Sequence, residues 1–247
     1  MERRYVIAAG VAFMTFLCSG VAYAGTAVAT IKIGVLTDMS SLYADNAGEG
    51  SVLATRVAAE DFAALHKDGP KIEILSGDHL NKPDVGAATA RRWLDVDKVN
   101  AIVDVPNSGV ALAVNEVLRG THAAFIASSA AASDLTGKFC SPNTVQWTYD
   151  TFALGAGTAK VLLKQGYDTW FFLASDYALG HALARDTGSS VTAEGGKVLG
   201  EIRHPINTAD FSSFLLEAQA SNAKVIALPD AGAGRTEVDQ GSLRERA

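Results

Sequence analysis

Cysteine is almost absent from this chain of 247 residues, which contains only Cys18 and Cys140. Cys18 lies in an N-terminal segment that we expect to be removed, so the mature chain keeps a single cysteine and has no intramolecular disulfide. A protein without disulfides depends on a buried core, and hydrophobic residues make up 48% of the sequence. That fraction is enough for a core and argues against an intrinsically disordered chain.

The chain also lacks a cluster of basic residues. Its 21 Lys and Arg residues are outnumbered by 27 Asp and Glu residues, which gives a formal net charge of −6. Nucleic acids and anionic membrane surfaces bind proteins through dense positive charge. We therefore expect neither of them as a partner.

Sequence motifs of enzymes are missing as well. No G-x-G-x-x-G follows the first predicted strand, at residues 31–36, and neither a P-loop nor a G-x-S-x-G motif occurs. The five histidines are scattered and never four residues apart. Asp78 and His79 follow a predicted strand and could serve catalysis or a metal, but an ordinary surface loop is the favoured interpretation. We expect no catalytic residue, no metal ligand and no cofactor.

The N-terminus carries the pattern of a signal peptide. Arg3 and Arg4 precede an apolar run over residues 5–17, and Ala22-Tyr23-Ala24 fits the small-x-small cleavage pattern. The run is shorter than the roughly 20 residues of a membrane span, so a retained anchor is the less favoured alternative. Residues 1–24 are therefore predicted to be a signal peptide that is cleaved after Ala24, which places the mature protein in the periplasm.

Short β-type runs alternate with amphipathic stretches through the rest of the chain. Strands are predicted at residues 31–36, 71–75, 101–103, 123–126, 169–173, 197–202 and 224–228. Helices are predicted at 50–65, 84–95, 108–118, 151–165, 177–191 and 211–220. Strands separated by helices of 10–15 residues indicate βαβ units and an α/β fold with doubly wound, Rossmann-like parallel sheets.

The chain divides into two predicted lobes. The irregular segment 139–150, which carries Pro142, is a plausible hinge. We expect an N-terminal lobe at 25–149 and the beginning of a second lobe at 150–230. Residues 231–247 lose all apolar periodicity, so we interpret them as an aberrant or disordered tail, caused by truncation or a shifted reading frame near Pro229. The second lobe is then incomplete.

Hydroxyl groups stand next to helix starts at the ends of three predicted strands, at residues 37–43, 106–109 and 127–130. A helix N-terminus has free N–H groups and a partial positive charge, so it can hold a carboxylate. For any one of these sites an ordinary N-cap is the better interpretation. The set, on one edge of a sheet, favours a shared ligand cleft.

Seven sequence segments in this order resemble periplasmic binding proteins of the leucine/isoleucine/valine type. They are IKIGVLTDMSSLYADNAGEGS, DHLNKPDVGAATARRW, AIVDVPNSGVALAVNEV, FIASSAAASDLTG, VQWTYDTFALGAGTAK, ASDYALGHAL and DFSSFLLEAQASNAKVIAL. The resemblance implies a type I binding protein with two lobes that close on a small solute. It also implies delivery of the solute to an inner-membrane ABC permease, a monomeric state and no catalysis.

The resemblance also implies roles for individual residues. Ligand contacts are expected from Tyr43 and Tyr177 as aromatic covers, from Ser108 at the ligand carboxylate, and from the backbone of Ser129, Ala130 and Ala131. Asp150 is expected to order the hinge.

Two departures from the family pattern leave the ligand open. The segment 129–132 lacks the threonine that relatives often place there, and the acidic residue that holds the ligand ammonium would lie beyond Leu228, without a recognisable counterpart. The expected ligand is therefore a small carboxylate-bearing solute, either a branched-chain amino acid or a related acid, with aromatic acids included. The alternatives are a ligand-sensing ectodomain of the same fold, a secreted α/β enzyme and a non-functional truncated fragment.

Overall fold

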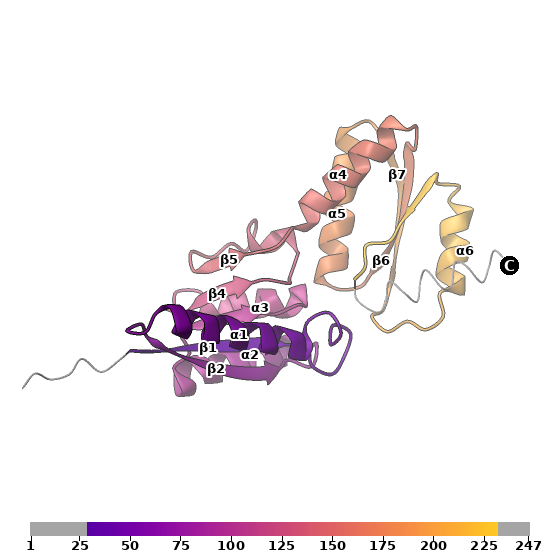
Figure 1. Cartoon of the computed structure of the whole chain (residues 1–247). Coiled ribbons are helices and arrows are strands. Elements are labelled where there is room, and N and C mark those ends of the chain that lie inside the picture. Colours follow the sequence, from indigo (N-terminus) through magenta and orange to yellow (C-terminus); the bar gives the residue numbers. More distant parts are fainter. Residues whose placement is uncertain (1–28, 232–247) are drawn as a thin grey trace, which may run out of the picture.

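The computed structural model describes residues 29–231 and shows two parallel sheets, each flanked by helices (Figure 1). The signal peptide predicted at residues 1–24, its cleavage site and residues 232–247 of the predicted tail lie outside the described residues. We call residues 29–149 lobe 1 and residues 150–231 lobe 2. Within the described chain, no helix is both long and apolar enough to span a bilayer.

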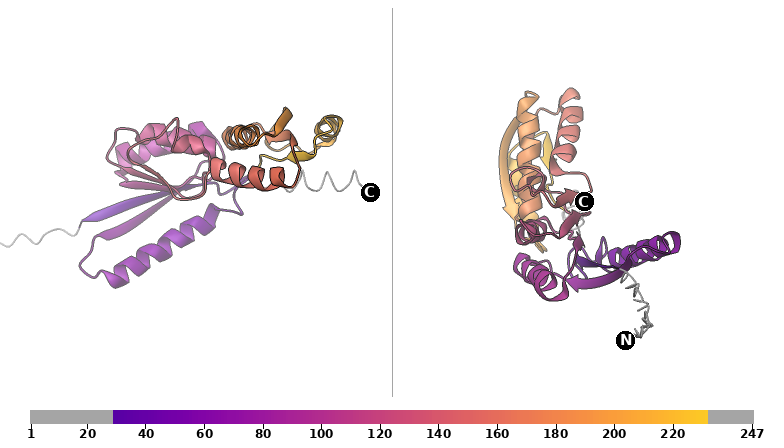
Figure 2. Two further views of the ribbon diagram at one scale, coloured as in Figure 1. Left: turned by 90° about the horizontal axis from the view of Figure 1, so that it is seen from above. Right: turned by 90° about the vertical axis from the view of Figure 1, so that its left-hand side faces the viewer.

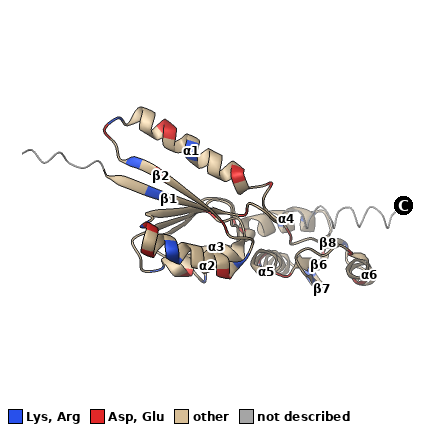
Figure 3. Ribbon diagram, turned by 90° about the horizontal axis from the view of Figure 1, so that it is seen from below, with Lys and Arg blue, Asp and Glu red and all other residues tan. Residues whose placement is uncertain are grey.

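Lobe 1 is built on a sheet of five parallel strands in the order β2-β1-β3-β4-β5. The strands are β1 (Thr30–Thr37), β2 (Lys71–Asp78), β3 (Ala101–Asp104), β4 (Ala124–Ala127) and β5 (Thr144–Gln146). The helices are α1 (Gly48–Leu65), α2 (Pro83–Arg92), the π-helical turn η1 (Trp93–Asp97), α3 (Ser108–Leu118) and the short 3₁₀ turn η2 (Ser133–Leu135). Helix α1 covers one face of the sheet, and α2 and α3 cover the other (Figures 2 and 3).

Lobe 2 contains three parallel strands in the order β7-β6-β8. Its elements are α4 (Thr151–Lys164), β6 (Thr169–Ser175), α5 (Ala178–Ala193), β7 (Lys197–His204), α6 (Ser212–Ala220) and β8 (Val225–Ala227). The two sheets and their parallel strands confirm the predicted α/β fold of two doubly wound lobes. Strand β8 is an edge of its sheet, which agrees with the prediction of an incomplete second lobe.

Two elements differ from the sequence-based expectation. The segment 139–150 is not irregular throughout, because Thr144–Gln146 forms β5 and pairs with β4. This strand is short and polar at both ends, so it leaves no apolar run to recognise. The helix predicted at 84–95 ends at Arg92, and the chain continues through a π-helical turn that buries Trp93.

The core of lobe 1 is centred on Trp93. Its indole lies against the backbone of β1 and β2, where Gly34 and Gly77 leave room for the ring: a Cβ added to Gly34 would lie 2.4 Å from Trp93 Cε3. The face of the sheet under α2 and α3 holds a cluster of buried apolar side chains that includes Ile102, Val114 and Phe125. The packed side of lobe 1 is therefore the side away from α1.

Carboxylates fasten the loops at the carboxyl edge of this sheet. Asp38 Oδ2 accepts hydrogen bonds from the Tyr43 N–H (2.9 Å) and the Ser41 hydroxyl (2.7 Å). Asp78 accepts bonds from the Ser40 hydroxyl (2.7 Å) and the Met39 N–H (3.2 Å). These bonds hold the loop after β1 against the end of β2, and so fix the position of Tyr43.

His79 is fully buried, so the prediction of an ordinary surface loop at Asp78 and His79 was wrong. Its Nδ1 accepts a hydrogen bond from the Asn81 N–H (3.0 Å), which makes it part of the turn into α2. Burial lowers the pKa of the His79 imidazole, and the nearby carboxylates of Asp38, Asp78 and Asp104 oppose this shift only in part. His79 is therefore a neutral core residue.

We expect Gly34→Ala to lower the free energy of unfolding by about 1–3 kcal/mol, because the new methyl group overpacks the Trp93 ring. Gly50→Ala in α1 is the matched control, since a Cβ there meets nothing within 4 Å. The control should be neutral or stabilising by up to about 1 kcal/mol, because alanine favours helix. Urea unfolding measures both values. Equal stability of the two variants would contradict the packing described for Trp93.

Burial of His79 also predicts how stability depends on pH. The unfolded chain takes up a proton below about pH 6.5, while the folded chain resists doing so because its His79 pKa is lower. Stability that is present above pH 6.5 should therefore fall as the pH drops, by up to about 1.4 kcal/mol per pH unit, until the folded-state pKa is reached. His79→Gln should make this decline shallower in urea unfolding between about pH 7.5 and 5.5. The exposed His122→Gln should leave the decline unchanged; an identical slope in His79→Gln and the parent would refute the assignment.

Candidate functional site

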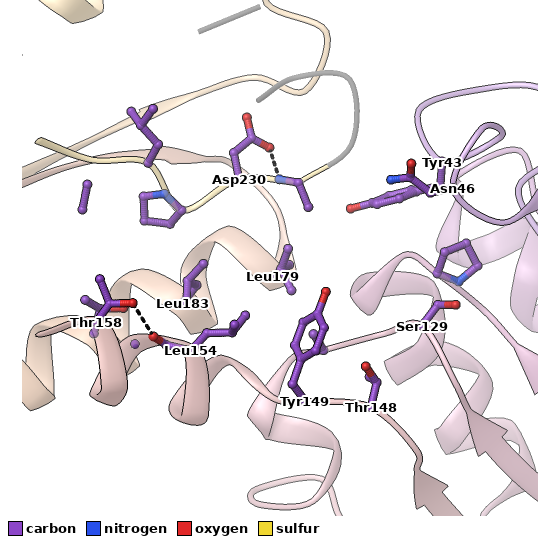
Figure 4. Close-up of a pocket in the computed structure, with 18 of the residues that line it drawn as sticks. Tyr43, Asn46, Ser129, Thr148, Tyr149, Leu154, Thr158, Leu179, Leu183 and Asp230 are labelled. Atoms are coloured by element: carbon purple, nitrogen blue, oxygen red, sulfur yellow. Dashed lines mark hydrogen bonds between the residues drawn. The ribbon is translucent and has the colours of Figure 1, made fainter. Parts of the chain in front are cut away.

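A cavity of about 1000 Å³ lies between the two lobes, at the carboxyl end of the sheet in lobe 1, and it continues along β6 and β8 in lobe 2. Lobe 1 contributes residues from the loops after β1, β3, β4 and β5, and lobe 2 contributes residues from α4, β6, α5, β8 and the segment after β8. Figure 4 shows Tyr43, Ser129, Thr148, Tyr149 and Asp230 around this space. The order of strands reverses between β1 and β3, and ligands of open α/β sheets bind at such a switch point.

The two predicted tyrosines meet at the lobe boundary. The hydroxyl groups of Tyr43 and Tyr177 lie 2.5 Å apart, and Ala131 and Leu179 pack against them. Burial raises the pKa of both phenols, and the nearby Asp230 carboxylate adds to the shift, so both are neutral. Tyr43 lines the cavity, whereas Tyr177 does not line it and contacts Tyr43 through its hydroxyl group. Their ligand contacts stay a prediction, but the structure brings the two residues together.

Ser108 does not line the cavity in this arrangement of the lobes. It is buried at the first residue of α3, and its Oγ accepts a hydrogen bond from the Ala132 N–H (3.2 Å). The neighbouring Asn107 is the N-cap, whose Oδ1 accepts bonds from the N–H groups of Gly109 and Val110. The protein itself thus uses part of the anion-binding capacity of this helix start. The contact from Ser108 to a ligand carboxylate stays a prediction.

The loop after β4 presents two of its three predicted residues. Ser129 and Ala131 line the cavity, whereas Ala130 is fully buried and its carbonyl accepts a bond from Gln146 Nε2 (3.1 Å). The Ser129 hydroxyl donates a hydrogen bond to Asp104 Oδ1 (2.6 Å). A ligand could then bind to the lone pairs of this hydroxyl oxygen or to the backbone N–H of Ser129. Asp104 and Val105 both have positive φ, at 78° and 60°. A valine in this region is strained, and such strain concentrates at ligand sites.

The crossover between the lobes adds residues that the sequence analysis did not select. Thr148 and Tyr149 line the cavity, and the Tyr149 side chain is mostly exposed. Asp150 follows them as the N-cap of α4 and accepts a bond from the Ala153 N–H (2.7 Å). Its predicted hinge role stays a prediction. The signal for Thr148 and Tyr149 was their place after a strand, which was missed together with β5.

Asp230 is a further cavity residue that the sequence analysis did not select. It follows β8, is 8% exposed and lines the cavity (Figure 4). Its Oδ1 accepts a bond from the Ala231 N–H (2.7 Å), and its Oδ2 lies 3.4 Å from Nε2 of the buried His204. His204 in turn packs edge-on against Phe211. The sequence analysis identified no acidic counterpart beyond Leu228, and Asp230 stands two residues past the predicted strand 224–228.

No group of three or more His, Cys, Asp or Glu side chains between residues 29 and 231 has the geometry of a metal site. Histidine and carboxylate do meet at Asp230 and His204, and at Asp176 and His181. The lining of the cavity combines hydroxyl groups, backbone groups and one carboxylate with apolar side chains such as Leu154, Leu179 and Leu183. This composition suits binding of a small solute that has a polar group at each end.

Comparison with known proteins agrees with this architecture. Residues 30–238 match the family model described as periplasmic binding protein, which extends beyond Leu228, where the resemblance seen in the sequence ended. A relative from Brucella abortus, the Leu/Ile/Val-binding protein homolog 6, is 24% identical over 216 residues. That alignment covers 84% of this chain and 52% of the relative, so the chain spans about half the length of the curated relatives it matches.

Solved structures support the same conclusion. A periplasmic binding protein from Burkholderia mallei is 43% identical with a TM-score of 0.83, over 87% of this chain and 57% of that one. A solute-binding protein of an ABC transporter from R. palustris, solved in complex with 4-hydroxybenzoate, is 25% identical with a TM-score of 0.74, over 87% of this chain and 58% of that one. With the two parallel sheets and the cavity between them, the match over residues 30–238 makes this chain a member of the periplasmic binding protein family.

Proposed function

We propose that this chain is the solute-binding component of a bacterial ABC importer and that it holds a small carboxylate-bearing solute between its lobes. The observation that carries the proposal is the cavity between the lobes, with Ser129 and Ala131 on one side and Asp230 on the other. A solute that spans the two sides needs an anionic end for lobe 1 and a hydrogen-bond donor for Asp230.

The relatives point to two solute classes with these properties. One is named for leucine, isoleucine and valine, and another was solved with 4-hydroxybenzoate. Both classes carry a carboxylate, and they differ in the donor group: an amino acid has an ammonium group on the carbon next to its carboxylate, and 4-hydroxybenzoate has a phenol at the far end of its ring. Either group can donate a hydrogen bond to the carboxylate of Asp230. Tyr43 and Tyr149 also line the cavity and supply aromatic surface.

The remaining parts of the proposal follow from the family. We infer that the mature chain acts in the periplasm as a monomer, delivers its solute to an inner-membrane permease and catalyses no reaction. The acidic net charge and the lack of a basic cluster support a small-molecule partner over a nucleic acid.

Calorimetric titration of the purified chain with 4-hydroxybenzoate and, separately, with L-leucine tests the proposal. We expect saturable binding of one solute molecule per chain for at least one of the two. The cavity offers one side for a carboxylate, at Ser129 and Ala131, and one side for a hydrogen-bond donor, at Asp230. D-Glucose, which carries no carboxylate, is the negative control. Absence of saturable heat with both carboxylates, from a chain shown to be folded by circular dichroism, would contradict the function.

Asp230→Asn tests the donor end of the solute. Losing one charge-assisted hydrogen bond should weaken 4-hydroxybenzoate or leucine binding by about ten- to a hundredfold, which corresponds to roughly 1.5–3 kcal/mol. Benzoate lacks the donor and should bind the variant and the parent equally. Glu217→Gln, an exposed change on α6, is the control for charge. If the affinities for 4-hydroxybenzoate and benzoate fall by the same factor, Asp230 does not accept a hydrogen bond from the donor group of the solute.

A further inference from the structure

A network of hydrogen bonds outside the cavity joins the two lobes at Asp186. Asp186 lies in the middle of α5 and is buried. Its Oδ2 accepts bonds from the hydroxyls of Ser133 in lobe 1 and Thr151 at the start of α4, each at 2.6 Å. Its Oδ1 accepts a bond from Arg185 Nε (2.9 Å). The Asp186 carboxylate thus bonds to lobe 1 at Ser133, to the start of α4 at Thr151 and to its own helix at Arg185.

Arg185 extends the network across the same boundary. Its Nη1 forms an ion pair with Asp134 (3.1 Å), and its Nη2 donates to Ser133 Oγ (2.9 Å). Each hydroxyl group of the network donates one hydrogen bond and accepts another. Ser133 Oγ donates to Asp186 and accepts from Arg185, and Thr151 Oγ1 donates to Asp186 and accepts from the Ser133 N–H (3.0 Å). A network without conflict has one preferred geometry.

The network leads directly to the cavity. The Thr151 N–H donates to the carbonyl of Ala131 (2.9 Å), and Ala131 lines the cavity in the loop after β4. The loop is therefore held by Thr151 at Ala131 and again at Ser133, and Thr151 is held by Asp186 of lobe 2. Rotation of lobe 2 away from lobe 1 would separate Ser133 from both Asp186 and Arg185.

We propose that Asp186 is a positioning residue that stabilises the observed arrangement of the lobes through its bond to Ser133, and that it holds the loop at Ala131 through Thr151. The bond to Ser133 and the ion pair between Arg185 and Asp134 form only when the lobes stand as they do here. The bond to Thr151 lies within lobe 2 and survives any rotation. Asp186 thereby couples the geometry of the cavity loop to the angle between the lobes, whatever the solute is.

The test measures the distance between the lobes without any solute, so its outcome is independent of the proposed function. Cys140 in lobe 1 is exposed and accepts one spin label, and Glu194→Cys, exposed at the end of α5, accepts the other. Cys18 is replaced by serine. Double electron–electron resonance then reports the distribution of distances between the two labels.

Ser133→Ala is the decisive variant, because it removes the hydroxyl that bonds to Asp186 and Arg185 across the lobes and leaves the bond from Thr151 to Asp186. We expect a distribution that is broader and shifted to longer distances by several ångströms. Asp186→Asn should shift it in the same direction. Ser133→Thr keeps the hydroxyl and should restore the parent distribution. Asp168→Asn, which breaks an exposed ion pair with Lys224 inside lobe 2, is the matched control and should change nothing.

If Asp186 and Ser133 only stabilised the fold, their variants would have a lower melting temperature, and the distances between the two labels in the folded chain would not change. If Ser133→Ala and Asp186→Asn both give the parent distribution, the proposal is wrong, even if either variant is less stable. Should Asp186→Asn fail to fold, Ser133→Ala and its threonine rescue decide the question alone.

Discussion

Parallel pairing of the strands is the constraint on which the site depends. Leu36 pairs with Asp104, and Ala127 pairs with Gln146, so the carboxyl ends of β1, β3, β4 and β5 reach one edge of the sheet in lobe 1. Ser175 pairs with His204, which aligns the ends of β6 and β7 in lobe 2. Since every strand is followed by its loop at this edge, residues far apart in sequence surround one space. An antiparallel strand in either sheet would have sent its loop to the opposite edge.

The polar groups at this edge have two distinct tasks. Asp38 and Asp78 accept hydrogen bonds from the loop after β1, and Asn107 caps α3, so these side chains build the rim of the cavity and are themselves largely satisfied. Ser129, Tyr149 and Asp230 line the space that the rim encloses. Asp104 does not line the space itself, but it orients Ser129, which does, from a backbone in a strained conformation. The distinction shows that a hydroxyl near a helix start can build the rim, as Ser41 does, or line the cavity, as Ser129 does.

Sequence periodicity identified most strands and helices, because a buried parallel strand is a continuous apolar run and its helix has apolar residues on one face. It missed β5, whose three residues contain only Val145 as an apolar side chain. The motif resemblance located Tyr43, Ser129 and Ala131 at the cavity but also selected Ser108, which a neighbouring loop covers. Whether a hydroxyl faces a cavity or a backbone N–H depends on how adjacent loops pack, and a linear sequence does not contain that information. Asp230 was not selected because it lies just beyond Leu228, where the motif resemblance ended.

The central claim is that the space between the lobes holds a small carboxylate by its two ends. A crystal structure of the chain grown with 4-hydroxybenzoate tests this claim most directly. We expect the aromatic ring between the lobes, with its carboxylate within hydrogen-bond distance of the segment from Ser129 to Ala131 and its hydroxyl within the same distance of Asp230. Density for the ligand only outside this cavity, or inside it with neither end in contact with these residues, would contradict the account.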